Sequence, residues 1–127
     1  MDDLYRDEIL EHYREPHNFG TLDTPTASHE GHNPLCGDRI TIMLTVDEAG
    51  VVSDVAFSGR GCAISQASAS MLTDEVKGRP LAEVEAMKNQ DILDLLGLEI
   101  SPARLKCALL SLETMHRALE GREAGTP

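Results

Sequence analysis

The chain has 127 residues, 41% of them hydrophobic and 26% charged, so we expect one globular domain. A net charge of −11 excludes a nucleic-acid binder that relies on a basic surface, and it disfavours binding to an anionic membrane. No apolar run reaches the roughly 18 residues of a membrane span. The N-terminus is acidic rather than signal-like, so we expect a cytoplasmic protein.

The first half of the chain predicts a helix followed by strands. Residues 2–15 carry apolar side chains near helical spacing. Residues 16–38, rich in proline and glycine, indicate a loop with one short strand near 24–30. Two stretches rich in β-branched residues, 39–47 and 51–59, flank a short turn and predict a β-hairpin.

The second half predicts helices. One begins at or just after Cys62, and two shorter ones follow, the second with Asn89 as N-cap. A long helix begins after Ser101 and ends before Gly121, which leaves 122–127 as a disordered tail. We therefore expect a single α+β domain over 1–127: a small antiparallel sheet of about three strands, with helices on one face, including an N-terminal helix and a long C-terminal helix.

The segment "PLCGDR" places Cys36 two residues before Asp38. In a strand these side chains point to the same side, and Gly37 gives a hinge that lets both reach one ion from a loop. Two anions this close repel one another unless a cation joins them, so a metal is the natural partner. A solvated turn residue is the ordinary alternative for Asp38.

The other two cysteines also lie at the edges of predicted elements. Cys62 falls at a helix start, where the helix dipole stabilises a thiolate; a small apolar packing residue is the alternative. Cys107 lies about 200° around the last helix from Leu105, off the apolar stripe that Leu105 begins, so packing on that main apolar face does not account for it. Leu110 lies near it, so partly apolar surroundings stay open as an alternative. Lys106 precedes it and favours its thiolate form.

Three thiolates and one carboxylate would complete a tetrahedral site. The spacings of 26 and 45 residues contain no Cys-x-x-Cys pair, so the pattern by itself is weak. Among the histidines, His12 and His17 flank the end of the first helix, and His116 suits a half-buried structural role. His32, four residues before Cys36, could approach the site, although a surface position is the commoner case.

Four segments together resemble the U-type iron–sulfur cluster assembly family, which includes IscU, the N-terminal domain of NifU and SufU. They are "YRDEILEHYREPHNFG" at 5–20, "NPLCGDRI" at 33–40, "GRGCAISQASASML" at 59–72 and "PARLKCALL" at 102–110. The likeness covers nearly the whole chain. It implies a compact α+β fold.

The resemblance also implies a site and two activities. The site gathers four ligands, Cys36, Asp38, Cys62 and Cys107, at one end of the molecule, and Cys36 and Cys107 are candidate persulfide acceptors. In the scaffold activity, sulfur from a cysteine desulfurase and iron form a transient [2Fe–2S] cluster that passes to acceptor apoproteins. In the SufU-like alternative, zinc holds the site and a cysteine relays persulfide sulfur, as in a sulfurtransferase.

Two departures leave the choice between these activities open. IscU proteins carry histidine directly before the third cysteine, whereas this chain has Lys106, as SufU does. SufU proteins carry an insertion between the second and third cysteines, for which the 45-residue interval here is too short. In addition, the Leu-Pro-Pro-Val-Lys chaperone-binding segment of IscU corresponds to "ISPAR" at 100–104, so a dedicated Hsp70 partner is not expected.

Overall fold

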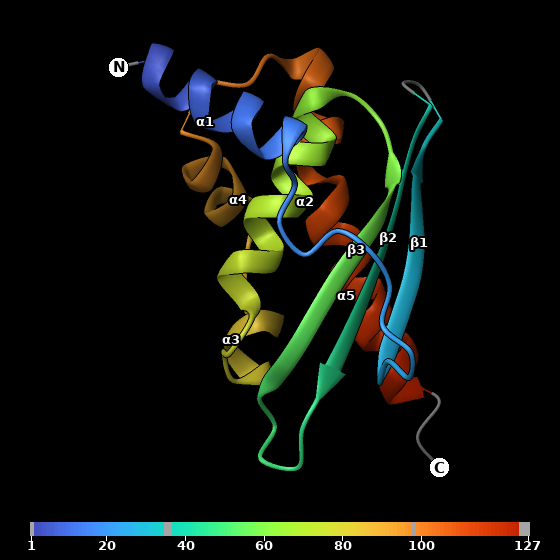
Figure 1. The fold of residues 1–127 in the computed structure, drawn as a ribbon. Helices are drawn as coiled ribbons and strands as arrows, with labels where there is room; N and C mark the ends of the chain where they lie inside the picture. The colour runs from blue at the N-terminus through green and yellow to red at the C-terminus, as the bar shows by residue number, and fades with distance from the viewer. Residues whose placement is uncertain (1, 35–36, 98, 125–127) are drawn as a thin grey trace.

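The computed structural model describes residues 2–34, 37–97 and 99–124, and it confirms the α+β class (Figure 1). Its sheet is antiparallel, with strand order β1-β2-β3. In chain order the elements are α1 (Asp2–Arg14), β1 (Ala27–Asn33), β2 (Asp38–Val46), β3 (Val52–Arg60), α2 (Ala63–Val76), α3 (Leu81–Glu85), α4 (Asn89–Leu96), a 3-10 turn (Pro102–Arg104) and α5 (Leu105–Ala124).

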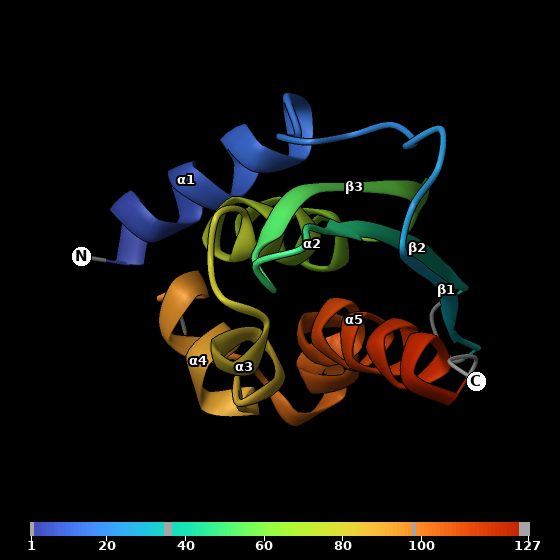
Figure 2. The same ribbon diagram turned by 90° about the horizontal axis from the view of Figure 1, so that it is seen from below.

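The helices α2 and α5 cover one face of the sheet, as Figure 2 shows. Helix α5 packs on β1 and β2, whereas α2 packs mainly on β3. The N-terminal helix α1 lies on α2 and has no comparable contact with the sheet. Helix α2 is therefore the centre of the molecule, between the sheet, α1, α4 and α5.

Strand β2 alternates between buried and more exposed residues along its first seven positions. Such alternation is expected when only one face of a sheet is covered. The buried row begins with a carboxylate, Asp38, and continues with three aliphatic residues, Ile40, Ile42 and Leu44, that are fully buried. Asp38 therefore points toward the helices although it is charged.

Small side chains allow α2 and α5 to approach one another closely. Ser68 is buried, and its hydroxyl donates to the Ala108 carbonyl at 2.7 Å and lies 2.9 Å from Ser111 Oγ. These bonds satisfy polar groups that burial would otherwise leave unpaired. The run of small residues over 65–70 serves close helix packing, as its composition indicates.

Several predicted boundaries shift. The first strand occupies Ala27–Asn33 rather than 24–30, because it pairs along β2 up to Asp38. The N-cap of α4 is Lys88 rather than Asn89, since the Lys88 N–H donates to the Asp91 carboxylate at 2.7 Å. At the other end of α4, Gly97 has φ of 68°, the left-handed conformation typical of a helix stop.

The sequence predicts that the last helix ends before Gly121. In the structure this helix continues to Ala124. Gly121 is exposed, and an exposed glycine inside a helix costs only about 1 kcal/mol relative to alanine. Residues 122–124 are therefore helical rather than part of a tail, and 125–127 lie outside the described residues. Over the part of the chain that the structure describes, no helix has the length and apolarity that crossing a membrane requires.

Candidate metal centre

Three of the four predicted ligands come together at one end of the molecule. Asp38, Cys62 and Cys107 each offer a ligand atom, and these atoms lie within 4.8 Å of one another. They come from three different elements: the first residue of β2, the residue before α2 and the first turn of α5. The fourth predicted ligand, Cys36, lies outside the described residues.

The position of Asp38 depends on Gly61, which lies in the connection between β3 and α2. A β-carbon on Gly61 would lie 2.6 Å from Asp38 Oδ1 and 2.9 Å from its carboxyl carbon, which is closer than such atoms approach. The missing side chain is therefore what leaves room for the carboxylate. Asp38 is only 2% exposed, so its charge must be compensated by the groups around it.

Two hydrogen bonds hold the Asp38 carboxylate. Its Oδ1 accepts the backbone N–H of Cys62 at 3.0 Å, and its Oδ2 accepts the hydroxyl of Ser65 at 2.5 Å. Both donors belong to the N-terminal end of α2, where the helix dipole favours a negative charge. Asp38 is thus a buried carboxylate held in a fixed orientation, and the alternative of a solvated turn residue is wrong.

Cys62 is the N-cap of α2, with extended backbone angles of φ −70° and ψ 168°, so the helix begins just after Cys62, within the predicted range. Its Sγ lies 3.9 Å from Asp38 Oδ2 and 3.6 Å from Ser65 Oγ. The side chain is partly exposed, which gives solvent and partners access to the site from this side.

Cys107 is buried, with none of its surface exposed, whereas Leu105, expected to begin the apolar stripe, is 36% exposed. The burial of Cys107 is thus more complete than the partly apolar surroundings that the sequence indicates. Helix α5 packs between the sheet and α2, so a wider arc of its surface is buried than one stripe would cover. Asn33 Nδ2 donates to Cys107 Sγ at 3.6 Å.

The chemistry of this donor set fits a cation. Two thiolates and one carboxylate would place three negative charges in a largely buried space, which is costly without a positive charge among them. No lysine or arginine forms an ion pair with Asp38 within the described ranges. Soft thiolate ligands suit iron–sulfur clusters and zinc.

Two residues of the site, Ser65 and Asn33, are not among the sequence-predicted ligands. Both are nearly fully buried, at 1% and 4% exposure. The Ser65 hydroxyl joins two ligands, since it donates to Asp38 and lies 3.3 Å from the Cys107 carbonyl oxygen. Ser65 follows Cys62 by three residues, the spacing that places two side chains on one helix face, so the sequence did carry a signal for it.

The histidines do not join the centre. His32 is exposed on β1, and its Nε2 pairs with Glu30 at 3.0 Å. His116 has the half-buried structural position expected of it, with Nε2 3.3 Å from the Val84 carbonyl oxygen.

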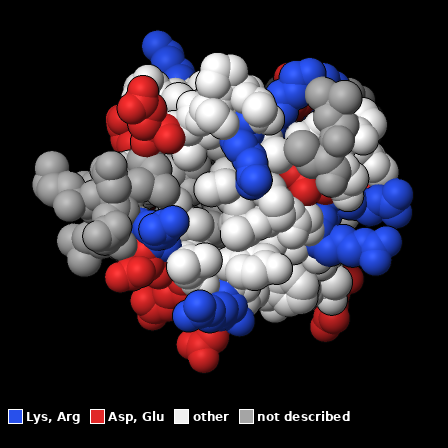
Figure 3. Space-filling model, turned by 90° about the horizontal axis from the view of Figure 1, so that it is seen from above, with Lys and Arg blue, Asp and Glu red and all other residues white. Residues whose placement is uncertain are grey.

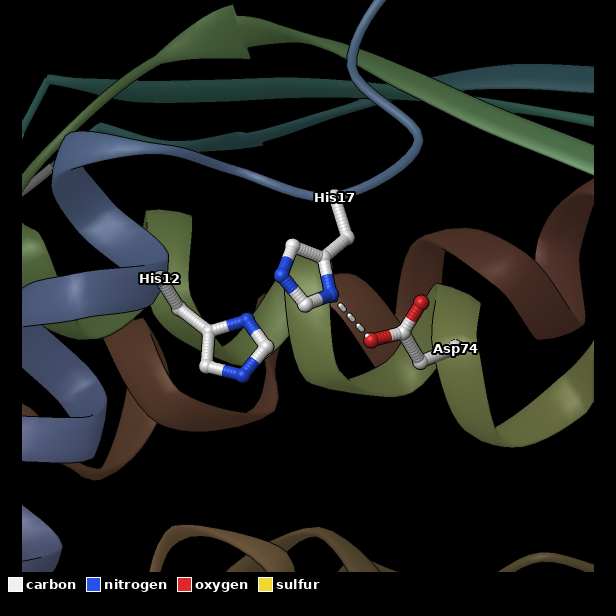
Figure 4. A group of neighbouring side chains, drawn as sticks. All are labelled: His12, His17 and Asp74. Carbon is white, nitrogen blue, oxygen red and sulfur yellow. Dashed lines mark hydrogen bonds and ion pairs between the residues drawn. The ribbon is translucent and has the colours of Figure 1, made fainter.

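His12 and His17 instead lie side by side near Asp74, far along α2 from Cys62 (Figure 4). Burial lowers the pKa of His12, and the neighbouring His17 lowers it further.

The fold and the centre together define a small α+β domain with cysteine and carboxylate groups at one end. The family model of the NifU-like N-terminal domain matches residues 4–124. The chain belongs to this family.

Two curated relatives represent two branches of that family. The zinc-dependent sulfurtransferase SufU of Bacillus subtilis is 35% identical, with 98% of this chain and 95% of that protein covered. The iron–sulfur cluster assembly scaffold protein IscU of Haemophilus influenzae is 33% identical, with 94% and 96% covered. The SufU alignment runs over 142 positions, more than the length of this chain, so SufU carries residues that have no counterpart here.

A solved structure agrees with the fold. The NifU-like N-terminal protein from Brucella abortus superposes with a TM-score of 0.79 at 27% sequence identity. The match covers 98% of this chain and 98% of that protein.

Proposed function

We propose that this protein is a cytoplasmic iron–sulfur cluster assembly scaffold. It receives sulfur from a cysteine desulfurase and iron, assembles a transient [2Fe–2S] cluster, and transfers that cluster to acceptor apoproteins. The proposed ligands are Cys36, Asp38, Cys62 and Cys107. The cluster is the cargo of the protein rather than a permanent cofactor.

The convergence of Asp38, Cys62 and Cys107 within 4.8 Å is the observation that carries this proposal. These residues lie far apart in the sequence, and side chains that only pack in the core do not require three potential ligands at one point. Thiolates bind the irons of a cluster, and partial exposure of Cys62 leaves one side through which iron and sulfur enter and the cluster leaves.

Asp38 makes the site suited to release. A carboxylate is a harder ligand than a thiolate and holds iron less strongly. Its two hydrogen bonds, from the Cys62 N–H and the Ser65 hydroxyl, stay in place when the metal leaves and stabilise the charge of the free carboxylate. These hydrogen bonds therefore lower the free-energy cost of leaving the Asp38 carboxylate without a metal ion.

Sulfur arrives by transfer between thiols. A thiolate of the scaffold attacks the outer sulfur of the desulfurase persulfide, the sulfur–sulfur bond to the enzyme breaks, and the enzyme cysteine leaves as a thiolate. The candidate acceptors are Cys36 and Cys107. Because Cys107 is fully buried, uptake at that residue requires the beginning of α5 to move away from β1 and α2.

Positive side chains surround the site although the chain as a whole is acidic. Figure 3 views the molecule from the end where the site lies, with lysine and arginine side chains at several points around this face. Arg39, Arg60, Arg104 and Lys106 are exposed at the strand and helix ends that carry the ligands. None of them forms an ion pair with a described carboxylate. We expect the desulfurase and acceptors to present acidic surfaces here.

A zinc-dependent sulfur relay is the second candidate function. It is favoured by the similarity to SufU of Bacillus subtilis and by Lys106, the basic residue directly before Cys107. In that case the same ligands would hold Zn²⁺, which would fix the site and stabilise the thiolates. SufU carries residues that this chain lacks, and this difference favours the scaffold function instead.

Anaerobic reconstitution with iron, cysteine and a cysteine desulfurase tests the scaffold function. We expect the visible absorbance of a [2Fe–2S] cluster in the unaltered protein, its loss in Cys62→Ser, and its retention in the control His32→Ala, whose side chain lies on the surface of β1. A colourless unaltered protein would contradict the proposal.

Intact mass spectrometry separates the two functions. After incubation with the desulfurase and cysteine, both functions predict the gain of sulfur atoms, but only the scaffold then forms a cluster when iron is added. Sulfur loading with zinc retained and no cluster absorbance would establish the relay. Metal content of the protein as purified, measured in the same preparation, shows which ion accompanies each result.

A further inference from the structure

A second group of potential ligands lies at the opposite end of α2. His12 comes from α1, His17 from the segment that follows α1, and Asp74 from the last turn of α2. Figure 4 shows the two imidazole rings beside each other and the Asp74 carboxylate pointing toward His17. One ligand atom from each residue lies within 4.8 Å of the other two.

We propose that His12, His17 and Asp74 bind a divalent transition-metal ion of the zinc type. The site is separate from the thiol centre and joins α1 to α2. Two imidazoles and one carboxylate are a common ligand set for such ions, with solvent completing the coordination.

The spacing of the ligand atoms fits a single ion. Three ligand atoms that lie no more than 4.8 Å from one another can surround one ion, and side-chain rotations would bring each atom to the usual zinc–ligand distance of about 2.0–2.2 Å. The rings of His12 and His17 are already close, with centroids 4.5 Å apart.

Neighbouring groups hold the ligands in place, as they do around established metal sites. Ser70 Oγ lies 2.6 Å from His12 Nδ1 and also accepts the His17 backbone N–H at 2.8 Å, so one hydroxyl positions both histidines. Asn18 Nδ2 donates to Asp74 Oδ1 at 2.9 Å, which leaves Oδ2 directed at His17 Nδ1.

The cluster is open on one side. The side chain of His17 is 51% exposed and that of Asp74 is 45% exposed, whereas His12 is only 9% exposed beneath them. An ion can therefore enter from solvent and reach the inner imidazole. The other described histidine–carboxylate pair, His32 with Glu30, has no second imidazole and makes a matched comparison.

The two sites are far enough apart to load independently. Asp74 follows Cys62 by twelve residues, which corresponds to about 18 Å along an α-helix. The proposal therefore stands or falls separately from the scaffold function.

Zinc binding to the full-length protein tests the inference. The number of zinc ions per chain is measured by elemental analysis after equilibrium dialysis, and the affinity by competition with a chromophoric chelator. His17→Arg places a guanidinium beside Asp74 but cannot ligate zinc. We expect this variant to bind one zinc ion fewer, or to bind that ion at least about tenfold more weakly. His32→Ala should match the unaltered protein.

Further variants guard against misfolding and against confusion with the thiol centre. Asp74→Asn should weaken the same zinc equivalent, and circular dichroism checks that each variant remains folded. Cys62→Ser should retain the histidine-dependent zinc ion. Identical zinc content and affinity in the unaltered protein and His17→Arg would overturn the proposal, as would loss of the histidine-dependent ion in Cys62→Ser.

Discussion

Each end of helix α2 carries a group of potential metal ligands, and the two groups differ in how deeply they are buried. At its N-terminal end, Asp38 and Cys107 are almost completely buried, whereas at its C-terminal end His17 and Asp74 are about half exposed. A buried serine hydroxyl organises each end: Ser65 binds Asp38, and Ser70 binds His12 and the backbone of His17.

The difference lies in what supplies the ligands. The thiol centre is built from the sheet and two core helices, so its geometry is fixed by the packing of the whole domain. The histidine cluster depends on one surface helix, α1, and the segment after it packing on α2. We therefore expect changes at the first end to alter metal and cluster chemistry, and changes at the second to alter how α1 is attached.

Asp38→Ala should give the largest effect. In the proposed function Asp38 is the weakly held ligand that eases release, so we expect its loss to slow transfer of a preformed cluster to an acceptor apoprotein by about tenfold. Transfer is followed by the change in visible absorbance or circular dichroism. The control is Asp74→Asn at the other end of α2, which should transfer at the normal rate. Faster transfer from Asp38→Ala would show the release argument to be wrong.

Gly61→Ala should disturb the same end without removing a ligand. The added methyl group meets the Asp38 carboxylate at 2.6 Å, so the carboxylate must shift. We expect zinc affinity at the thiol centre to fall by about tenfold, measured by chelator competition. Gly121→Ala, with open space around the new β-carbon, is the control and should bind zinc normally. Unchanged affinity in Gly61→Ala would mean that Asp38 is not held as described.

The same substitution at the two serines compares the ends directly. Ser65→Ala and Ser70→Ala each leave buried polar groups without a partner, so each should lower the free energy of unfolding by about 1–3 kcal/mol in denaturant titrations. Only Ser65→Ala should also reduce cluster yield on reconstitution. Equal cluster yields in the two variants would show that Ser65 has no particular role in the thiol centre.

Gly121→Ala should give the smallest effect, and in the opposite direction. Gly121 lies in the exposed part of α5, so alanine should raise the free energy of unfolding by about 0.5–1 kcal/mol through helix propensity. Thermal or denaturant unfolding measures the change. A loss of stability would show that this turn of the helix requires glycine.

Predictions that rest on short-range sequence patterns were more accurate than those that depend on contacts between distant residues. The β-hairpin and the start of α2 at Cys62 were confirmed, because β-branched runs, turn residues and helix periodicity act over a few residues. The complete burial of Cys107 was not predicted, because one helical stripe does not reveal that α5 is covered by both the sheet and α2. Ser65 had a signal, its spacing from Cys62, but nothing in the sequence links it to Asp38.

The sequence by itself determined the fold class, the family and the candidate ligands of the metal centre, since composition, periodicity and motifs are properties of the chain. Tertiary structure alone decided which side chains meet. It buried Asp38 beside the end of α2, enclosed Cys107, and brought His12 and His17 to Asp74. The physical reason is that such contacts join residues far apart in the chain, and only packing of the shared core fixes their distances and their exposure to water.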